Sequence, residues 1–331
     1  SFLVVAGQDA ASAPLNDALL TTDRGTTFAI KSTAVFTSPR SSPGLVATGP
    51  TSFVAFGGAN GATKFNEVRQ SVNSGATWTT LQCASGAASW TPRSQMGYAY
   101  MPLLKRILVA GGDDSGANYA NDVWSSDDGG VCWTLLGYPH ASNYGFVGSS
   151  LLVVTLGIFE MLLLIGGYTT QGTAGNFQEI LRSSNGGVTW EKVDHVAGKQ
   201  SNLGVTAPSQ RRYTAAVFDP WYKRVVVLGG EGIQNCCQQP AYDGTNFVYH
   251  NDVNTIDATH FFKGFIHHIQ EDCETTCRAS PTCQTYMKKI SSLRPLFSGE
   301  TGKWEHMVRF CAFSDETEVE LRPVFSSTMT L

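Results

Sequence analysis

The chain repeats one pattern of apolar and polar positions. In each copy, a short run of β-branched, leucine and aromatic residues ends in glycine, and a polar loop with an Asn-Asp-like pair follows. The last glycines of the runs lie 51, 54, 55 and 63 residues apart, at Gly7, Gly58, Gly112, Gly167 and Gly230. A period of about 50 residues indicates a repeat protein in which each copy is one small sheet packed against its neighbours.

A polar turn of the pattern Ser/Thr-x-Asp/Asn-x-Gly-x-x-Trp/Phe completes each copy. The short polar residues of these turns are Asp23, Asn73, Asp128 and Asn185, with Asp257 in a fifth copy that has lost its glycine. An Asp or Asn side chain can accept hydrogen bonds from nearby backbone N–H groups, and glycine readily takes a positive φ. Each turn therefore predicts the connection of a hairpin, with its aromatic residue packed between neighbouring sheets.

These motifs resemble two families. The glycine-ended runs and the Asn-Asp-like pairs are similar to kelch repeats, and the turns resemble the Asp-boxes of sialidases and other propellers, over residues 1–262. The resemblance implies an all-β fold, a β-propeller of four-stranded antiparallel blades. Five repeats are visible, and a sixth, divergent blade after residue 262 stays open.

The third repeat illustrates the expected strands, at residues 96–101, 107–110, 122–125 and 132–136. The first repeat lacks its opening strand, and residues 318–325 are a candidate to complete that blade, because closure removes exposed sheet edges. The longest apolar stretch, residues 151–165, is interrupted by a glycine and a glutamate and falls short of the roughly 20 residues of a membrane span. It predicts two buried strands around a turn and no membrane insertion.

After residue 262 the repeats stop and cysteines cluster. Cys273, Cys277 and Cys283 have the spacing C-x3-C-x5-C, which resembles the PAN/apple module, and residues 263–315 are assigned to it. The resemblance implies a short helix stapled to a small sheet, Cys311 as the remaining partner, and binding of proteins or glycans. A disulfide-stapled extension that caps the propeller is the alternative interpretation, and residues 316–331 would hold the closing strand.

Eight cysteines, an even number with four of them clustered, favour disulfides over a zinc site, because paired C-x2-C spacing is missing. Cys83, Cys132, Cys236 and Cys237 are the other disulfide candidates. The vicinal pair could bridge to itself, pair with Cys83 or Cys132, or link subunits. Disulfides indicate an oxidising compartment, so we expect an extracellular or cell-surface location.

Charge excludes two classes of partner. Only 15% of the residues are charged, the formal net charge is −4, and no run of Lys or Arg is present. The sequence therefore predicts binding neither to nucleic acid nor to an anionic membrane. It also predicts no catalytic set, no metal and no cofactor.

Binding candidates come from two places in the repeats. Arg93 and Arg211 occupy equivalent positions before the first strand of a repeat, and Gln238 and Tyr242 lie in the longest loop, residues 231–250. Loops on a rigid scaffold often carry binding. We expect a non-catalytic recognition, adhesion or structural-assembly protein with protein or glycan ligands, or self-assembly into an extracellular structure. The alternatives are a sialidase-like glycoside hydrolase, which requires Arg93 or Arg211 and a tyrosine such as Tyr213 to point into the central channel, and an intracellular kelch adaptor.

Overall fold

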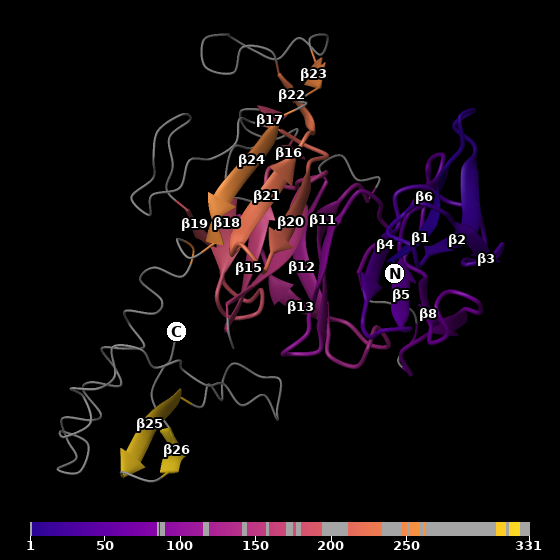
Figure 1. Ribbon diagram of the computed structural model, residues 1–331. Coiled ribbons are helices and arrows are strands. Elements are labelled where there is room, and N and C mark those ends of the chain that lie inside the picture. Colours follow the sequence, from indigo (N-terminus) through magenta and orange to yellow (C-terminus); the bar gives the residue numbers. More distant parts are fainter. Residues whose placement is uncertain are drawn as a thin grey trace.

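The main part of the fold consists of five antiparallel sheets of three or four strands that follow one another along the chain (Figure 1). This computed structural model describes residues 2–84, 86, 90–114, 119–140, 144–156, 159–169, 175–176, 180–193, 211–233, 247–249, 252–258, 261, 309–315 and 318–324. Each sheet corresponds to one sequence repeat, and we number the sheets as blades 1 to 5. No helix among the described residues is both long and apolar enough to span a membrane.

The strands of each blade pair in chain order. Blade 1 contains β1 (Phe2–Gln8), β2 (Pro14–Thr21) and β3 (Ala29–Ser32), and blade 2 contains β4 (Gly44–Ala47), β5 (Phe53–Phe56), β8 (Val68–Ser71) and β9 (Thr79–Leu81). Blade 3 contains β10 (Gly97–Met101), β11 (Arg106–Gly112), β12 (Ala120–Ser126) and β13 (Thr134–Gly137). Blade 4 contains β14 (Ser150–Leu156), β15 (Phe159–Ile165), β18 (Ile180–Ser183) and β19 (Glu191–Lys192), and blade 5 contains β20 (Ala215–Asp219), β21 (Arg224–Leu228) and β24 (Val253–Asp257).

Short hairpins extend the second and third strands of three blades beyond the main sheet. They are β6 (Ala59–Asn60) with β7 (Thr63–Lys64), β16 (Tyr168–Thr169) with β17 (Gly175–Asn176), and β22 (Glu231–Ile233) with β23 (Phe247–Tyr249). Each begins directly after a Gly-Gly pair, so the two glycines mark the point where the chain leaves the blade.

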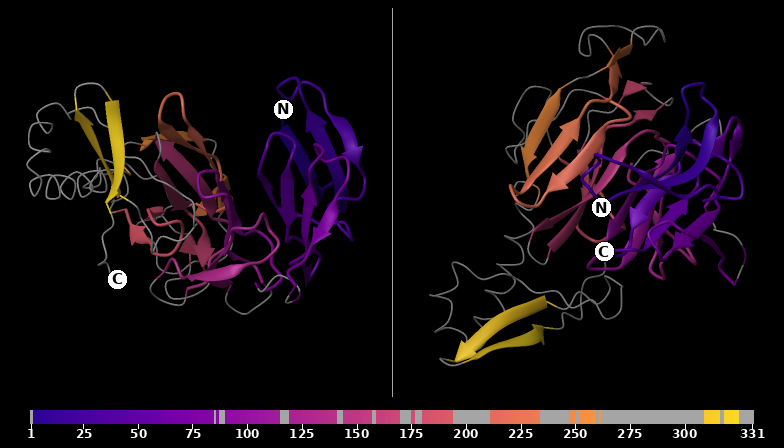
Figure 2. Two further views of the ribbon diagram at one scale, coloured as in Figure 1. Left: turned by 90° about the horizontal axis from the view of Figure 1, so that it is seen from below. Right: turned by 45° about the vertical axis from the view of Figure 1, so that its right-hand side comes forward.

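The blades are arranged around a common axis. The first strands of blades 2 to 5 lie side by side, β4 beside β10, β10 beside β14, and β14 beside β20. Figure 2 shows the blades following one another along an arc, from the indigo N-terminal blade to the orange fifth blade. The prediction of an all-β propeller with antiparallel blades is confirmed.

One expected pairing differs from the sequence analysis. The candidate closing strand at residues 318–325 was expected beside the first blade, but β26 (Glu318–Val324) pairs with β25 (Arg309–Asp315) in a separate two-stranded sheet. Local hairpin pairing has a lower chain-closure cost than pairing with a strand some 300 residues away. Blade 1 thus keeps three strands, and blade 5 also has three described strands.

The core is divided among the contacts between successive blades. Four apolar clusters lie between blades 1 and 2, 2 and 3, 3 and 4, and 4 and 5. In β15, Met161 and Leu163 face blade 5, whereas Leu162 and Leu164 face blade 3, and all four are buried. A sheet covered on both faces has strands that are apolar throughout. This is why the repeats contain continuous apolar runs.

Backbone hydrogen bonds connect successive blades near their axis. The second glycine of the Gly-Gly position donates its N–H to a carbonyl of the next blade in four cases: Gly7 to Arg40 (3.1 Å), Gly58 to Arg93 (2.9 Å), Gly112 to Phe146 (2.8 Å) and Gly167 to Arg211 (2.9 Å). At Gly58, where φ is +94°, a Cβ would lie 2.9 Å from the Ser41 carbonyl oxygen. The glycine is needed both for its backbone conformation and for this close approach.

The polar turns have the hydrogen bonds that their residues predict. Asp23, Asn73, Asp128 and Asn185 each accept a backbone N–H from the residue four positions later, at 2.9 Å in every case. Hydrogen bonds from Thr27 and Thr21 hold the pKa of Asp23 below its usual range. The glycines of these turns have positive φ, and a side chain at Gly75 would approach Leu3 of the preceding blade to 2.9 Å. Each turn therefore shapes its own hairpin and fits against the neighbouring blade.

A disulfide joins two neighbouring blades. Cys83, just after the last strand of blade 2, bonds to Cys132, in the polar turn of blade 3, with the Cα atoms 4.8 Å apart. Neither is therefore available to Cys236 or Cys237, which excludes that pairing. Cys236, Cys237, Cys273, Cys277 and Cys283 lie outside the described residues, and Cys311 lies in β25.

Replacing both Cys83 and Cys132 with serine should lower the free energy of unfolding by about 2–5 kcal/mol, because the bridge closes a long loop in the unfolded chain. The two cysteines are 49 positions apart. Urea unfolding followed by tryptophan fluorescence measures the change. Peptide mapping of the non-reduced wild-type protein is the independent check, and a free thiol at either position would contradict the bridge.

Candidate functional site

Three buried arginines connect strands within their own blades. Arg40, Arg93 and Arg211 stand before the first strands of blades 2, 3 and 5, and their side chains are at most 1% exposed. Each donates a hydrogen bond to the carbonyl of the first glycine of its Gly-Gly pair, at 3.2, 3.0 and 2.8 Å. The guanidinium group thus satisfies a carbonyl that the turning chain leaves without a sheet partner.

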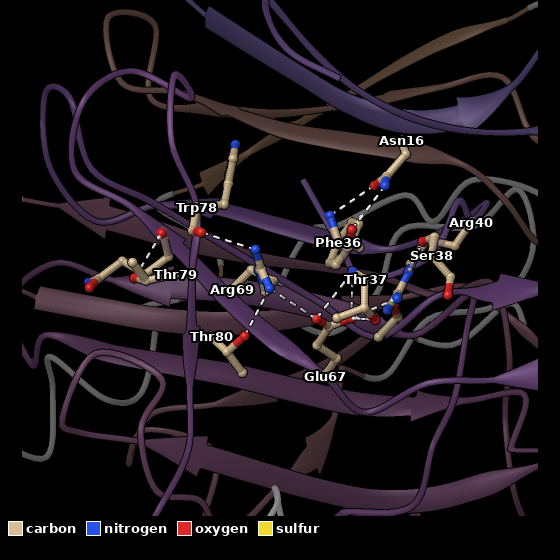
Figure 3. A network of polar contacts seen from close by, with 12 residues as sticks. Asn16, Phe36, Thr37, Ser38, Arg40, Glu67, Arg69, Trp78, Thr79 and Thr80 are labelled. Atoms are coloured by element: carbon tan, nitrogen blue, oxygen red, sulfur yellow. Dashed lines mark hydrogen bonds and ion pairs between the residues drawn. The ribbon is translucent and has the colours of Figure 1, made fainter. Parts of the chain in front are cut away.

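Each of these arginines also forms an ion pair with an acid at the third strand. Arg40 contacts Glu67 at 2.7 Å, as Figure 3 shows, and Arg211 contacts Asp252 at 2.7 Å. Arg93 contacts Asp122 through both of its terminal nitrogens. Burial would raise the pKa of Asp122, but the hydrogen bonds and charge of Arg93 outweigh burial and hold that pKa below its ordinary value.

Blade 4 has no arginine at this position. Its equivalent residue is Phe146, which is fully buried and packs against Gly111 of blade 3. An apolar ring can therefore fill the same place. This exchange indicates that the position serves the packing of the propeller.

The residues singled out from the sequence fall into two groups. Arg93 and Arg211 are buried inside the blades, so they present no exposed guanidinium group to a ligand. Gln238 and Tyr242 lie outside the described residues. Asp257, the polar residue of the fifth turn, ends β24. Within the described residues, no group of three or more His, Cys, Asp or Glu side chains is placed to hold a metal ion.

A different set of residues gathers where the first strands begin, two positions after each arginine position. Here the backbone is left-handed in every blade from 2 to 5, at Ser42, Gln95, Gly148 and Tyr213. Gly148 donates its N–H to the Gln95 carbonyl at 3.0 Å, and Tyr213 donates its N–H to the Gly148 carbonyl at 2.7 Å. These bonds run from blade to blade around the axis. They hold the backbone in place at the same end of the propeller as the Gly-Gly pairs.

Tyr213 is the unusual member of this series. A bulky side chain rarely takes a positive φ, and Tyr213 has φ +54° with its side chain 44% exposed. Its ring lies over Gly148, where a Cβ would approach within 2.6 Å of it. Strained backbone that is held by its surroundings concentrates at functional sites. Tyr213 is therefore the strongest single indication of a binding site in the described residues.

Charged and aromatic groups surround Tyr213. Its hydroxyl donates to Gln95 Oε1 at 3.0 Å, and the Arg212 guanidinium lies over the rings of Tyr168 (4.7 Å) and Tyr213 (5.1 Å). Arg212 also forms an ion pair with Glu231 at 3.2 Å. We call this set the axial rim, which consists of Gln95, Asp113, Tyr168, Arg212, Tyr213 and Glu231.

The electrostatics of the axial rim disfavour ionisation of Tyr213. Burial raises the pKa of its hydroxyl, and nearby Tyr119, Glu231 and Asp113 raise it further against the opposing effect of Arg212. Asp113 is itself paired with Lys64 at 2.6 Å. A phenol that stays protonated is a hydrogen-bond donor at neutral pH and a poor nucleophile.

Sequence reasoning missed most of the axial rim because its members follow the conspicuous arginines and glycines by only one or two positions. When the repeats are aligned on the arginine position, Ser42, Gln95 and Gly148 occupy the same repeat position as Tyr213. The signal was a large aromatic residue at a position that elsewhere holds small or flexible residues.

The blades and their axial arrangement define the class of this protein as a β-propeller. A family model described as the DUF6242 beta propeller domain matches residues 87–249. The fold is also similar to a solved structure described as "Structure of YjhT", with 15% identity, coverage of 76% of this chain and 80% of that chain, and a TM-score of 0.53. No curated protein matches the chain.

Replacing Arg93 with methionine should lower the free energy of unfolding at pH 7 by about 3 kcal/mol, because it leaves the Asp122 carboxylate without its partner. The pKa of Asp122 is depressed in the folded protein, so the stability from this pair is present above the ordinary carboxyl pKa and is lost as the pH falls through the folded value. The variant should therefore lose less stability than the wild type between neutral and acid pH.

Urea unfolding of wild type and variant at pH 7 and pH 3 measures both effects. The double variant R93M/D122N is the matched control, since removing both charges should recover part of the loss at pH 7. A single R93M variant as stable as the wild type at neutral pH would contradict the structural role of Arg93.

Proposed function

We propose that this propeller is a non-catalytic recognition module that binds glycans or proteins through its axial rim. The observation that carries the proposal is the half-exposed ring of Tyr213 on a left-handed backbone. The fold itself does not need that ring, because Ser42, Gln95 and Gly148 hold the same backbone conformation in other blades.

The chemistry of the axial rim suits a ligand with both apolar and hydroxyl-rich faces. Tyr213 supplies an exposed aromatic face, and Arg212, which lies over the buried ring of Tyr168, supplies a planar hydrogen-bonding group beside it together with Glu231 and Gln95. Binding sites commonly combine apolar surface with a few well-placed polar groups. A sugar ring or a peptide side chain would meet that combination, and tyrosine and arginine are also enriched at the energetic centres of protein interfaces.

Details of the repeats support a more specific class of β-propeller for this chain. The Gly-Gly pairs, the buried arginines with their acids, and the turns of Asp23, Asn73, Asp128 and Asn185 all fit a kelch-type propeller with Asp-box turns. The PAN/apple-like module at residues 263–315 would add a second binding unit. Its cysteines before Cys311 lie outside the described residues.

The disulfide supports the proposed compartment. A bridge between Cys83 and Cys132 persists only where thiols are not kept reduced, which favours an extracellular or cell-surface protein. The buried ion pairs of Arg93 and Arg211 and the raised pKa of Tyr213 favour the recognition role over a sialidase-like hydrolase, which needs exposed arginines and an activated tyrosine.

Binding of the full chain to arrays of glycans and of extracellular proteins tests the proposal. We expect at least one ligand to bind, and Tyr213→Ala and Arg212→Ala to weaken that binding by about tenfold or more, as loss of an interface hot spot does. Tyr222→Ala is the matched control, because Tyr222 is also exposed and lies beside an arginine, but at the opposite end of blade 5. Equal losses in Y213A and Y222A, or turnover of a sialoside by the wild type, would overturn the proposal.

A further inference from the structure

On the outer face of blade 5, which points away from blade 4, apolar side chains have no described neighbour to cover them. Val253 is 64% exposed, although its equivalents in blades 2, 3 and 4 (Val68, Val123 and Ile180) are at most 2% exposed. Val217 and Leu228 lie on the same face by strand register and are exposed as well. Their equivalents in blade 4, Leu152 and Ile165, are buried against blade 5.

The opposite end of the blade series shows the complementary feature. Phe2, Val4 and Phe28 of blade 1 are exposed, although the residues equivalent to them in blade 2 are buried against blade 1. Those equivalents are Phe53, Ala55 and Trp78. Both end blades therefore carry the residue types of an interface between blades, and each has one such face without a neighbour among the described residues.

One described element of the same chain also needs a neighbour. The hairpin β25–β26 stands clear of the blades in Figure 1, and among the described strands β25 and β26 pair only with each other. An isolated two-stranded hairpin is at best marginally stable in water and usually needs a further packing surface. Its first strand contains the apolar run Phe310–Phe313, its second strand alternates charged and apolar residues from Glu318 to Leu321, and the register places Ala312 opposite Leu321.

We propose that the hairpin β25–β26 docks on the outer face of blade 5 and covers Val217, Leu228 and Val253. The hairpin is linked to blade 5 by the chain between Phe261 and Arg309, which is long enough to reach any part of that face. Linkage within one chain gives an effective concentration far above that of a second molecule. The same chain is therefore favoured over a second copy as the cover of this face.

Val253→Glu in the full chain tests this docking. We expect the melting temperature to fall by about 5 °C or more, because the glutamate would be placed in an apolar contact. Val72→Glu is the matched control, since Val72 is 63% exposed but lies in a polar turn, and it should change the melting temperature by no more than about 1 °C. Equal, small shifts in both variants would overturn the proposal.

A double-mutant cycle identifies the occupant of the face. Leu321→Glu should lower the melting temperature as V253E does, and the double variant V253E/L321E should fall by clearly less than the sum of the two. Strictly additive shifts would overturn the assignment of the hairpin. Light scattering of the wild type adds a second readout, and self-association that V253E abolishes would assign the face to another copy of the chain instead.

Carbene footprinting of the wild-type protein needs no variant. Docking predicts that Val253 is labelled far less than Val72, despite their nearly equal exposure in the structure of the blades. Equal labelling of the two valines would overturn the proposal even if the substituted proteins did not fold.

Discussion

The structure depends on one constraint, which is that each blade is apolar on both faces and cannot bury either face alone. The four core clusters lie between blades, so every sheet takes its stability from its neighbours. Repeat proteins of this kind have stabilities that are approximately sums of nearest-neighbour contacts. The polar turns and the glycines serve this arrangement, because they let chain segments approach the adjacent blade closely, as Gly75 does at Leu3.

Near the axis, hydrogen bonds complement this apolar packing. The buried arginines satisfy the glycine carbonyls, and the second glycines bond across to the next blade. These contacts fix the backbone immediately before the axial rim. Tyr213 can then hold an unfavourable φ, since its N–H bonds to Gly148 and its hydroxyl to Gln95. A rigid frame thus supports the strained residue that we assign to binding.

The sequence predicted the features that repeat and missed those that occur once. The strands of the third repeat and the division of residues 151–165 into β14 and β15 were predicted, because apolar runs and glycines report local geometry directly. The pairing of Cys83 with Cys132 could not be derived, because it depends on how two blades pack. The sequence named Tyr213 only as the candidate tyrosine of a hydrolase, because the residues of the axial rim come from different blades and are brought together by the blade arrangement.

Among the described residues, blades 2 and 3 are the one pair of blades that a disulfide joins covalently. Blades 2 and 3 are joined near the axis by the Gly58 to Arg93 hydrogen bond and farther out by the covalent bond from Cys83 to Cys132. Hydrogen bonds and apolar contacts can separate when a chain is pulled, whereas a disulfide cannot. In a stretched molecule the bond would therefore keep residues 83–132, with β10, β11 and β12 of blade 3, in a closed loop that the force does not extend, and the remaining sheets could re-form next to it when the force is released.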